Sequence, residues 1–122
     1  MPEIYTLQGN LLPKKNDLRR GKFGGVFHDA KHKINWDAFI LQAKVLWNGK
    51  PQIIADTIVR VIFYRATKHR VDTTNLASAL ADILERAGVV IDDVFLHVWP
   101  DPVRHDKKNP RVEFWFQIPI LN

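Results

Sequence analysis

The sequence contains no cysteine and no long apolar run. Without cysteine there is no disulfide framework and no thiolate zinc site, so histidine and carboxylate groups are the only strong metal ligands and any bound metal is expected to be a hard one. No segment approaches the ~20 consecutive apolar residues that span a bilayer. No charged-then-apolar signal peptide opens the chain either. We therefore expect a cytoplasmic protein with no membrane partner.

The length of the chain indicates the number of domains, and its charge indicates the class of partner. A chain of 122 residues, 46% apolar and 25% charged, fits one folded domain over residues 1–122. Lys and Arg number 18 against 13 Asp and Glu, a formal net charge of +5. Such an excess favours a polyanionic partner such as nucleic acid, because each neutralised phosphate releases a counterion. The basic side chains that we expect to hold the nucleic-acid backbone are Lys14, Lys15, Arg19, Arg20, Lys22, Lys68, His69 and Arg70.

Hydrophobic periodicity predicts two helices. In residues 34–47 the apolar residues Ile34, Ala38, Leu41 and Val45 recur every three to four positions, which is typical of an amphipathic helix. Residues 75–87 repeat this pattern with a polar opposite side, and Gly88 supplies a stop signal.

Alternating and β-branched stretches predict four strands, at residues 3–8, 57–65, 94–99 and 112–118. The last two flank a loop and are expected to form an antiparallel pair. A basic loop of residues 10–33 precedes the first helix, and its length favours a functional segment. The order β-α-β-α-β-β predicts an α+β fold, with two helices packed on one mixed sheet.

Carboxylates stand at both ends of the second predicted helix. Asp72 precedes it, and Asp92 and Asp93 follow it. If these acids converge, they form an oxygen-ligand site suited to Mg²⁺ or Mn²⁺, but the sequence does not fix whether they meet. Alternatively, Asp72 caps the helix, and Asp92 and Asp93 belong to a solvated turn.

The same stretch resembles the RusA family of Holliday junction resolvases, which are typically encoded by phages and prophages. The family carries an Asp-x-Asp-Asn motif, an Asp further along the helix, an Ala-Gly helix end and a closing Asp-Asp. The positions that match without a gap are Asp72, Asn75, Leu76, Asp82, Leu84, Ala87, Gly88, Asp92 and Asp93.

The resemblance implies a homodimer that resolves four-way junctions or related branched DNA by paired phosphodiester cleavage, in a bacterial or phage-infected cell. It implies Mg²⁺, or Mn²⁺, held by Asp72 and Asp93 with help from Asp92. Asn75 is implied to orient a ligand or to close the helix start. Phe23 or Phe27 of the basic loop would either wedge into the junction or lie in the core.

Two residues depart from the family motif. Thr74 replaces its second acid, and Ser78 replaces a lysine one turn into the helix. Thr74 brings a hydroxyl but no charge, and Ser78 removes a cation that would stabilise the scissile phosphate. The alternative function is therefore a catalytically impaired protein of the same fold that binds branched DNA.

Overall fold

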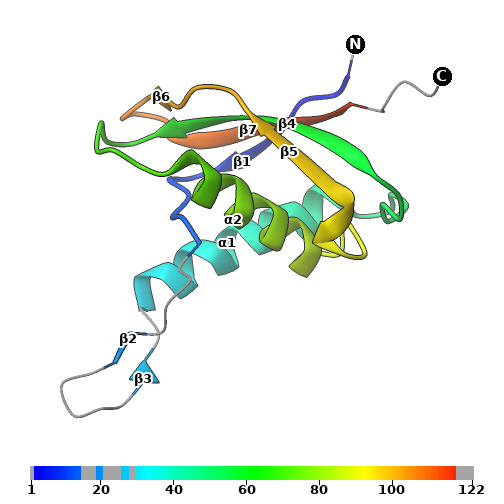
Figure 1. The fold of residues 1–122 in the computed structure, drawn as a ribbon, viewed down its shortest axis with the longest axis horizontal. Helices are drawn as coiled ribbons and strands as arrows, with labels where there is room; N and C mark the ends of the chain where they lie inside the picture. Colours follow the sequence, from blue (N-terminus) through cyan, green and yellow to red (C-terminus); the bar gives the residue numbers. More distant parts are fainter. Residues whose placement is uncertain (1, 15–18, 21–25, 28–29, 118–122) are drawn as a thin grey trace.

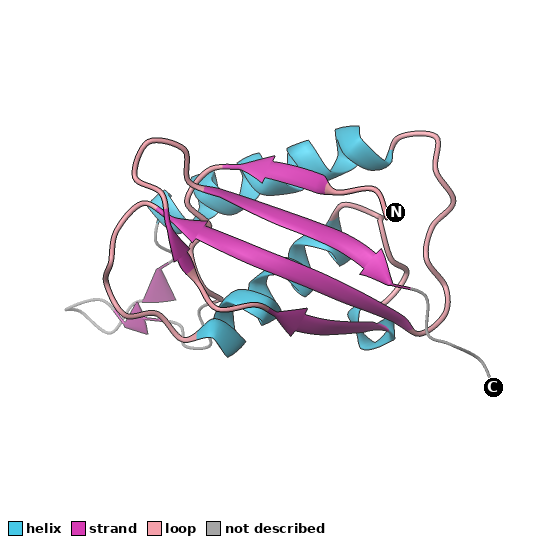
Figure 2. Cartoon of the chain, turned by 90° about the horizontal axis from the view of Figure 1, so that it is seen from above, coloured by secondary structure: helices cyan, strands magenta, loops and turns pink. Residues whose placement is uncertain are grey.

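The computed structural model describes residues 2–14, 19–20, 26–27 and 30–117. It has a five-stranded mixed sheet with two helices on one of its faces (Figures 1 and 2). This confirms the predicted α+β class. The sheet contains β1 (Tyr5–Gln8), β4 (Thr57–Arg65), β5 (Leu96–Pro100), β6 (Arg104–His105) and β7 (Arg111–Gln117), and the helices are α1 (Ala30–Trp47) and α2 (Thr73–Arg86). The short strands β2 (Arg19–Arg20) and β3 (Val26–Phe27) form a separate antiparallel pair, and a 3-10 turn, η1 (Asp93–Phe95), precedes β5.

Strand β4 is central, as its β-branched and aromatic sequence predicts. Its side chains alternate, and Val59, Val61 and Phe63 are almost fully buried against the helical layer. Burying an apolar side chain of this size contributes about 1.5–3 kcal/mol. The bounds agree with the prediction of residues 57–65.

The predicted pairing of the last two long strands is wrong. The sheet order is β1-β7-β4-β5, so β4 lies between β5 and β7. The unit β4-α2-β5 is a crossover that makes β5 parallel to β4, with Val59 opposite Val98. The chain then continues along the same side of β4 as β6 before β7 pairs antiparallel with its other side, with Val61 opposite Phe114.

Helix α2 confirms the second predicted helix. Its buried residues are Leu76, Ala79, Leu80, Ile83 and Leu84, which recur at helical spacing and pack into the core. Gly88 follows with a φ of 79°, a backbone conformation that glycine adopts without steric cost. The chain reverses there and returns toward the last turn of the helix.

Helix α1 begins four residues before the predicted start and is apolar on two sides. Its buried side carries Trp36, Phe39 and Ala43, and the Trp36 indole donates a hydrogen bond of 3.0 Å to the Leu12 carbonyl. The regular stripe that predicts this helix faces solvent instead; its members are Ile34, Ala38, Leu41 and Val45. The larger aromatic residues therefore determine which side of the helix meets the core.

Among the described residues, no helix combines the length and the apolar character needed to cross a membrane.

Candidate metal and nucleic-acid site

Asp72 caps helix α2. Its backbone is extended, with φ −76° and ψ 111°, and its Oδ1 accepts a hydrogen bond of 2.9 Å from the Thr74 amide. The first amides of a helix have no partner within the helix. A carboxylate at this position accepts a hydrogen bond from one of them, and its negative charge interacts favourably with the positive end of the helix dipole. Capping is thus the role that the contacts of Asp72 establish.

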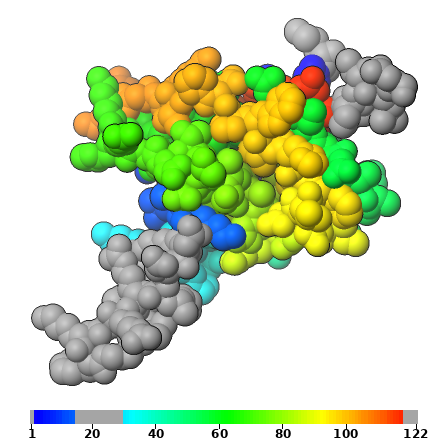
Figure 3. Space-filling view, viewed as in Figure 1, coloured from blue at the N-terminus to red at the C-terminus, as the bar shows by residue number. Residues whose placement is uncertain are grey.

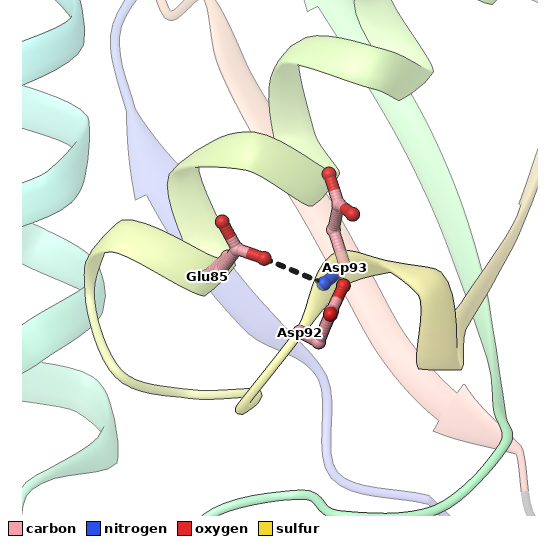
Figure 4. A group of neighbouring side chains, drawn as sticks. All are labelled: Glu85, Asp92 and Asp93. Carbon is pink, nitrogen blue, oxygen red and sulfur yellow. Dashed lines mark hydrogen bonds between the residues drawn. The ribbon is translucent and has the colours of Figure 1, made fainter.

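Asp92 and Asp93 lie beside the other end of α2. Asp92 caps η1 by accepting a hydrogen bond of 3.0 Å from the Val94 amide. The Asp93 amide donates one of 2.8 Å to Oε1 of Glu85, in the last turn of α2 (Figure 4). The backbone bend at η1 lets both acids take part in one cluster, which a regular strand would prevent because its neighbouring side chains point to opposite faces.

Glu85, Asp92 and Asp93 form a carboxylate trio. One carboxylate oxygen from each lies within 4.8 Å of the others, and this is a group that could hold a metal ion. Asp92 is exposed, whereas Glu85 and Asp93 are half-buried. Mg²⁺ takes oxygen ligands at about 2.1 Å and keeps several of its waters, so a partly open trio of carboxylates suits it chemically.

The trio concentrates negative charge. The pKa of Asp93 is raised above its ordinary value, first by burial and then by the negative charges of Glu85 and Asp92. Asp82 adds to this effect on the pKa, and Lys14 opposes it. Acids that repel one another in this way leave charge that a cation would compensate.

Lys14 and Arg86 border the trio through Asp82. The Asp82 side chain is 13% exposed and pairs with Arg86 at 2.9 Å and with Lys14 at 3.7 Å. The Lys14 amide also lies 3.3 Å from the Asn75 carbonyl, so the Lys14 segment runs along α2. Of the basic residues predicted to contact DNA, Lys14 is the one that these contacts place beside the acids.

The structure brings Asp92 and Asp93 together but leaves Asp72 away from them. Helix α2 has 14 residues, so its axis is about 20 Å long. Asp72 caps the first turn and Asp93 bonds to the last. Figure 3 shows the segment before α2 in green and the segment after it in yellow, on opposite sides of the molecular face. The three predicted metal ligands therefore do not form one cluster within a single chain.

The other predicted site residues are divided between this helix start and the basic loop. Lys68, His69 and Arg70 are exposed in the segment between β4 and α2, and Asn75 is half-buried in the first turn of α2. Arg19 and Arg20 form β2. Lys15, Lys22 and Phe23 lie outside the described residues, and of Phe27 only its place in β3 is described.

Sequence reasoning missed two residues of this region. Glu85 joins the trio because the turn at Gly88 returns Asp93 to the last turn of α2; its position one turn after Asp82 is the available signal. Arg65 is buried at the end of β4 and donates a hydrogen bond to the Leu11 carbonyl. Burial lowers the pKa of Arg65. This bond, with that from the Ala66 amide to Asn10, fixes the segment that leads to Lys14.

No protein-family model matches this chain, and a search of curated proteins gives no match. The resemblance to the RusA resolvases therefore remains a prediction that rests on the motif.

Proposed function

We propose that this protein is a Mg²⁺-dependent endonuclease that resolves Holliday junctions or related branched DNA in recombination and repair. The observation that carries the proposal is the carboxylate trio of Glu85, Asp92 and Asp93, on a chain of net charge +5 in which the positive charge of Lys14 acts on Asp93 and opposes the rise in its pKa. The motif resemblance supplies the reaction and the substrate.

In this proposal the trio holds Mg²⁺, or Mn²⁺ in its place. When bound, the ion supplies an activated water for in-line attack on a phosphodiester and offsets charge on the leaving oxygen. Burial and then the charges of Glu85 and Asp92 raise the pKa of Asp93, and a cation held at the trio would favour its ionised form. Lys14 is 38% exposed and is positioned to hold a phosphate oxygen near the trio.

The other basic residues bind the DNA backbone in this proposal. Lys68, His69 and Arg70 are exposed at the far end of α2, and phosphate contacts of this kind give affinity with little base specificity. Asp72 lies at that same end of α2. In this proposal it stabilises the start of the helix and does not belong to the trio. A homodimer provides two such sites for two symmetric strands. We propose a cytoplasmic location for this reaction.

The second candidate function is binding of branched DNA without cleavage. It is favoured by the separation of Asp72 from Asp93, together with Thr74 and Ser78 in place of the acid and the lysine of the family motif. If this candidate function is correct, Asp92 and Asp93 serve to stabilise η1 and its contact with the end of α2.

Cleavage of a synthetic four-way junction with Mg²⁺ or Mn²⁺ tests the two candidates. The wild-type protein is compared with Asp93→Asn and with the control Asp56→Asn, which changes an acid 72% exposed before β4. The nuclease proposal expects paired nicks from the wild type and from Asp56→Asn, and at least about a 100-fold loss of rate in Asp93→Asn. Tight junction binding with no nicking under either metal would refute the nuclease and leave the binding candidate.

A further inference from the structure

Helix α1 presents an apolar stripe to solvent. Ile34 is 69% exposed, Leu41 63% and Val45 69%, and Ala38 between them is also exposed. Single exposed apolar residues are normal on protein surfaces. These four are spaced by four, three and four positions over three turns of one helix. They therefore form one continuous apolar surface of the kind that a binding partner covers.

The core of the chain does not use this stripe. Trp36, Phe39 and Ala43 fill the side of α1 that packs within the domain, and in Figure 1 the sheet lies above α1. The spacing of the exposed side is that of the seam between two packed helices, where apolar residues alternate at three and four positions. A second helix with the same spacing is thus a fitting occupant, and this chain supplies one in each copy.

We propose that a second copy of this chain packs its α1 antiparallel against this stripe and forms a twofold symmetric dimer. In an antiparallel pair, Ile34 lies opposite Val45 of the partner subunit, and Ala38 lies opposite Leu41 of the partner subunit. The first contact pairs two residues of similar size, and the second pairs a small residue with a larger one. Both contacts therefore fill the space between the helices to a similar extent. Twofold symmetry repeats both contacts.

The charges beside the stripe fit the antiparallel direction. Asp37 and Lys44 flank the stripe on the same side, and this arrangement places Asp37 next to Lys44 of the partner subunit, twice. Within its own chain Asp37 pairs only with Lys33, at 2.7 Å, among the described residues. Lys44 is exposed and forms no ion pair with the part of the chain that the structure describes. A parallel pair would instead place Asp37 beside Gln42, without charge complementarity.

This inference deepens the proposed function, because paired cleavage calls for two copies, and it names the surface that joins them. Its evidence is the exposed stripe and its charges, which do not depend on the carboxylate trio. The two proposals can therefore fail separately.

Analytical ultracentrifugation over a wide concentration range tests the dimer. We expect the wild type to dimerise and Leu41→Glu to raise the dimer dissociation constant at least about 100-fold, because a carboxylate from each copy would lie in the seam. Ile54→Glu is the matched control, since Ile54 is 68% exposed outside the helix. It should dimerise like the wild type, and circular dichroism should show all three folded because both sites are exposed.

Disulfide trapping tests the direction. The chain has no cysteine, so single-cysteine variants report one contact each. A mixture of Ala38→Cys and Leu41→Cys should form mixed disulfide dimers on mild oxidation, whereas Ile54→Cys mixed with either should not. A wild type that stays monomeric, or a Leu41→Glu variant that dimerises as the wild type does, overturns the proposal.

The outcomes also separate this proposal from the nuclease. A wild type that dimerises through α1 and cuts no junction refutes the nuclease alone. A wild type that cuts junctions while Leu41→Glu remains dimeric refutes the interface alone. If Trp99→Glu, on the open sheet face, abolishes the dimer and Leu41→Glu does not, the sheet is the interface and the α1 proposal is wrong.

Discussion

The amide of Asp93 donates a hydrogen bond of 2.8 Å to the Glu85 carboxylate. This bond joins the start of η1 to the last turn of α2, and it holds the carboxylates of Asp93 and Glu85 at a distance where they repel each other. Burial is the first cause that raises the pKa of Asp93, and the repulsion by Glu85 is the second. A fold that keeps such a contact has a place where a cation would be stabilising, which is the physical basis of the proposed metal site.

Glu85→Gln should weaken metal binding while keeping the fold. The glutamine oxygen still accepts the Asp93 amide, but the trio loses one negative charge. We expect Mn²⁺ or Mg²⁺ affinity to fall about 10-fold or more, measured by isothermal titration calorimetry. The pKa of Asp93 should move down toward its ordinary value, since Glu85 is one cause of the shift.

Glu3→Gln is the control for this change. Glu3 is 66% exposed, and its partners are Tyr5 and Lys50, which do not belong to the trio. Equal metal affinity in Glu85→Gln and the wild type would show that the trio is not the metal site.

Gly88→Ala should lower both stability and metal affinity. Gly88 has a φ of 79°, and an added Cβ would meet nothing within 4 Å, so the cost is conformational. We expect a loss of about 1 kcal/mol in the free energy of unfolding by urea denaturation. The strained turn should also shift Asp92 and Asp93 relative to Glu85 and weaken metal binding.

Gly49→Ala is a matched control. Gly49 has the same φ of 79°, also with nothing within 4 Å, but it follows α1. It should lose similar stability and keep the metal affinity of the wild type. A parallel fall in affinity for both variants would attribute the effect to general destabilisation.

The sequence predicts those features that depend on local pattern. The strand Thr57–Arg65 and the buried side of α2 follow from neighbouring residues whose spacing matches one kind of element. Helix α1 differs because it is apolar on two sides. Both the stripe with Leu41 and the side with Phe39 have helical spacing, and only tertiary packing selects Phe39 for the core.

Long-range relations are the part that local pattern cannot supply. Strands β5 and β7 are separated in the chain only by the two-residue strand β6, yet they lie on opposite sides of β4, because strand pairing is decided by the whole sheet. Likewise, Glu85 joins Asp93 through a turn of specific geometry at Gly88. The sequence predicts a helix between Asp72 and the pair Asp92 and Asp93, but a linear pattern does not show whether the chain folds back far enough for these acids to meet.

Asp72 variants should separate capping from chemistry. Asp72→Ala removes the acceptor for the Thr74 amide and should lower the free energy of unfolding by about 1 kcal/mol. Asp72→Asn keeps an acceptor oxygen and should retain nearly all of that stability. Thermal and urea unfolding measure both effects.

The Mn²⁺ or Mg²⁺ affinity of Asp72→Asn then reports the effect of the Asp72 charge alone. We expect its metal affinity to equal that of the wild type, because Asp72 lies at the other end of α2 from the trio. A loss of affinity as large as that in Asp93→Asn would place Asp72 in the metal site and contradict this arrangement.

Asp106 should make stability depend on pH at acid values. The Arg111 guanidinium, at 2.9 Å, is the main cause that lowers the pKa of Asp106 below 3.8. A carboxyl whose pKa is lower in the folded chain adds stability above its unfolded pKa, and this stability is lost as the pH falls through the folded value. Asp106→Asn should therefore be less stable than the wild type at pH ~7, and the difference should shrink below pH ~4 as the wild-type carboxylate gains its proton. Urea denaturation of both proteins across this pH range measures the difference. A gap that stays constant into the acid range would show that the bond geometry, and not the charge of Asp106, stabilises the turn before β7.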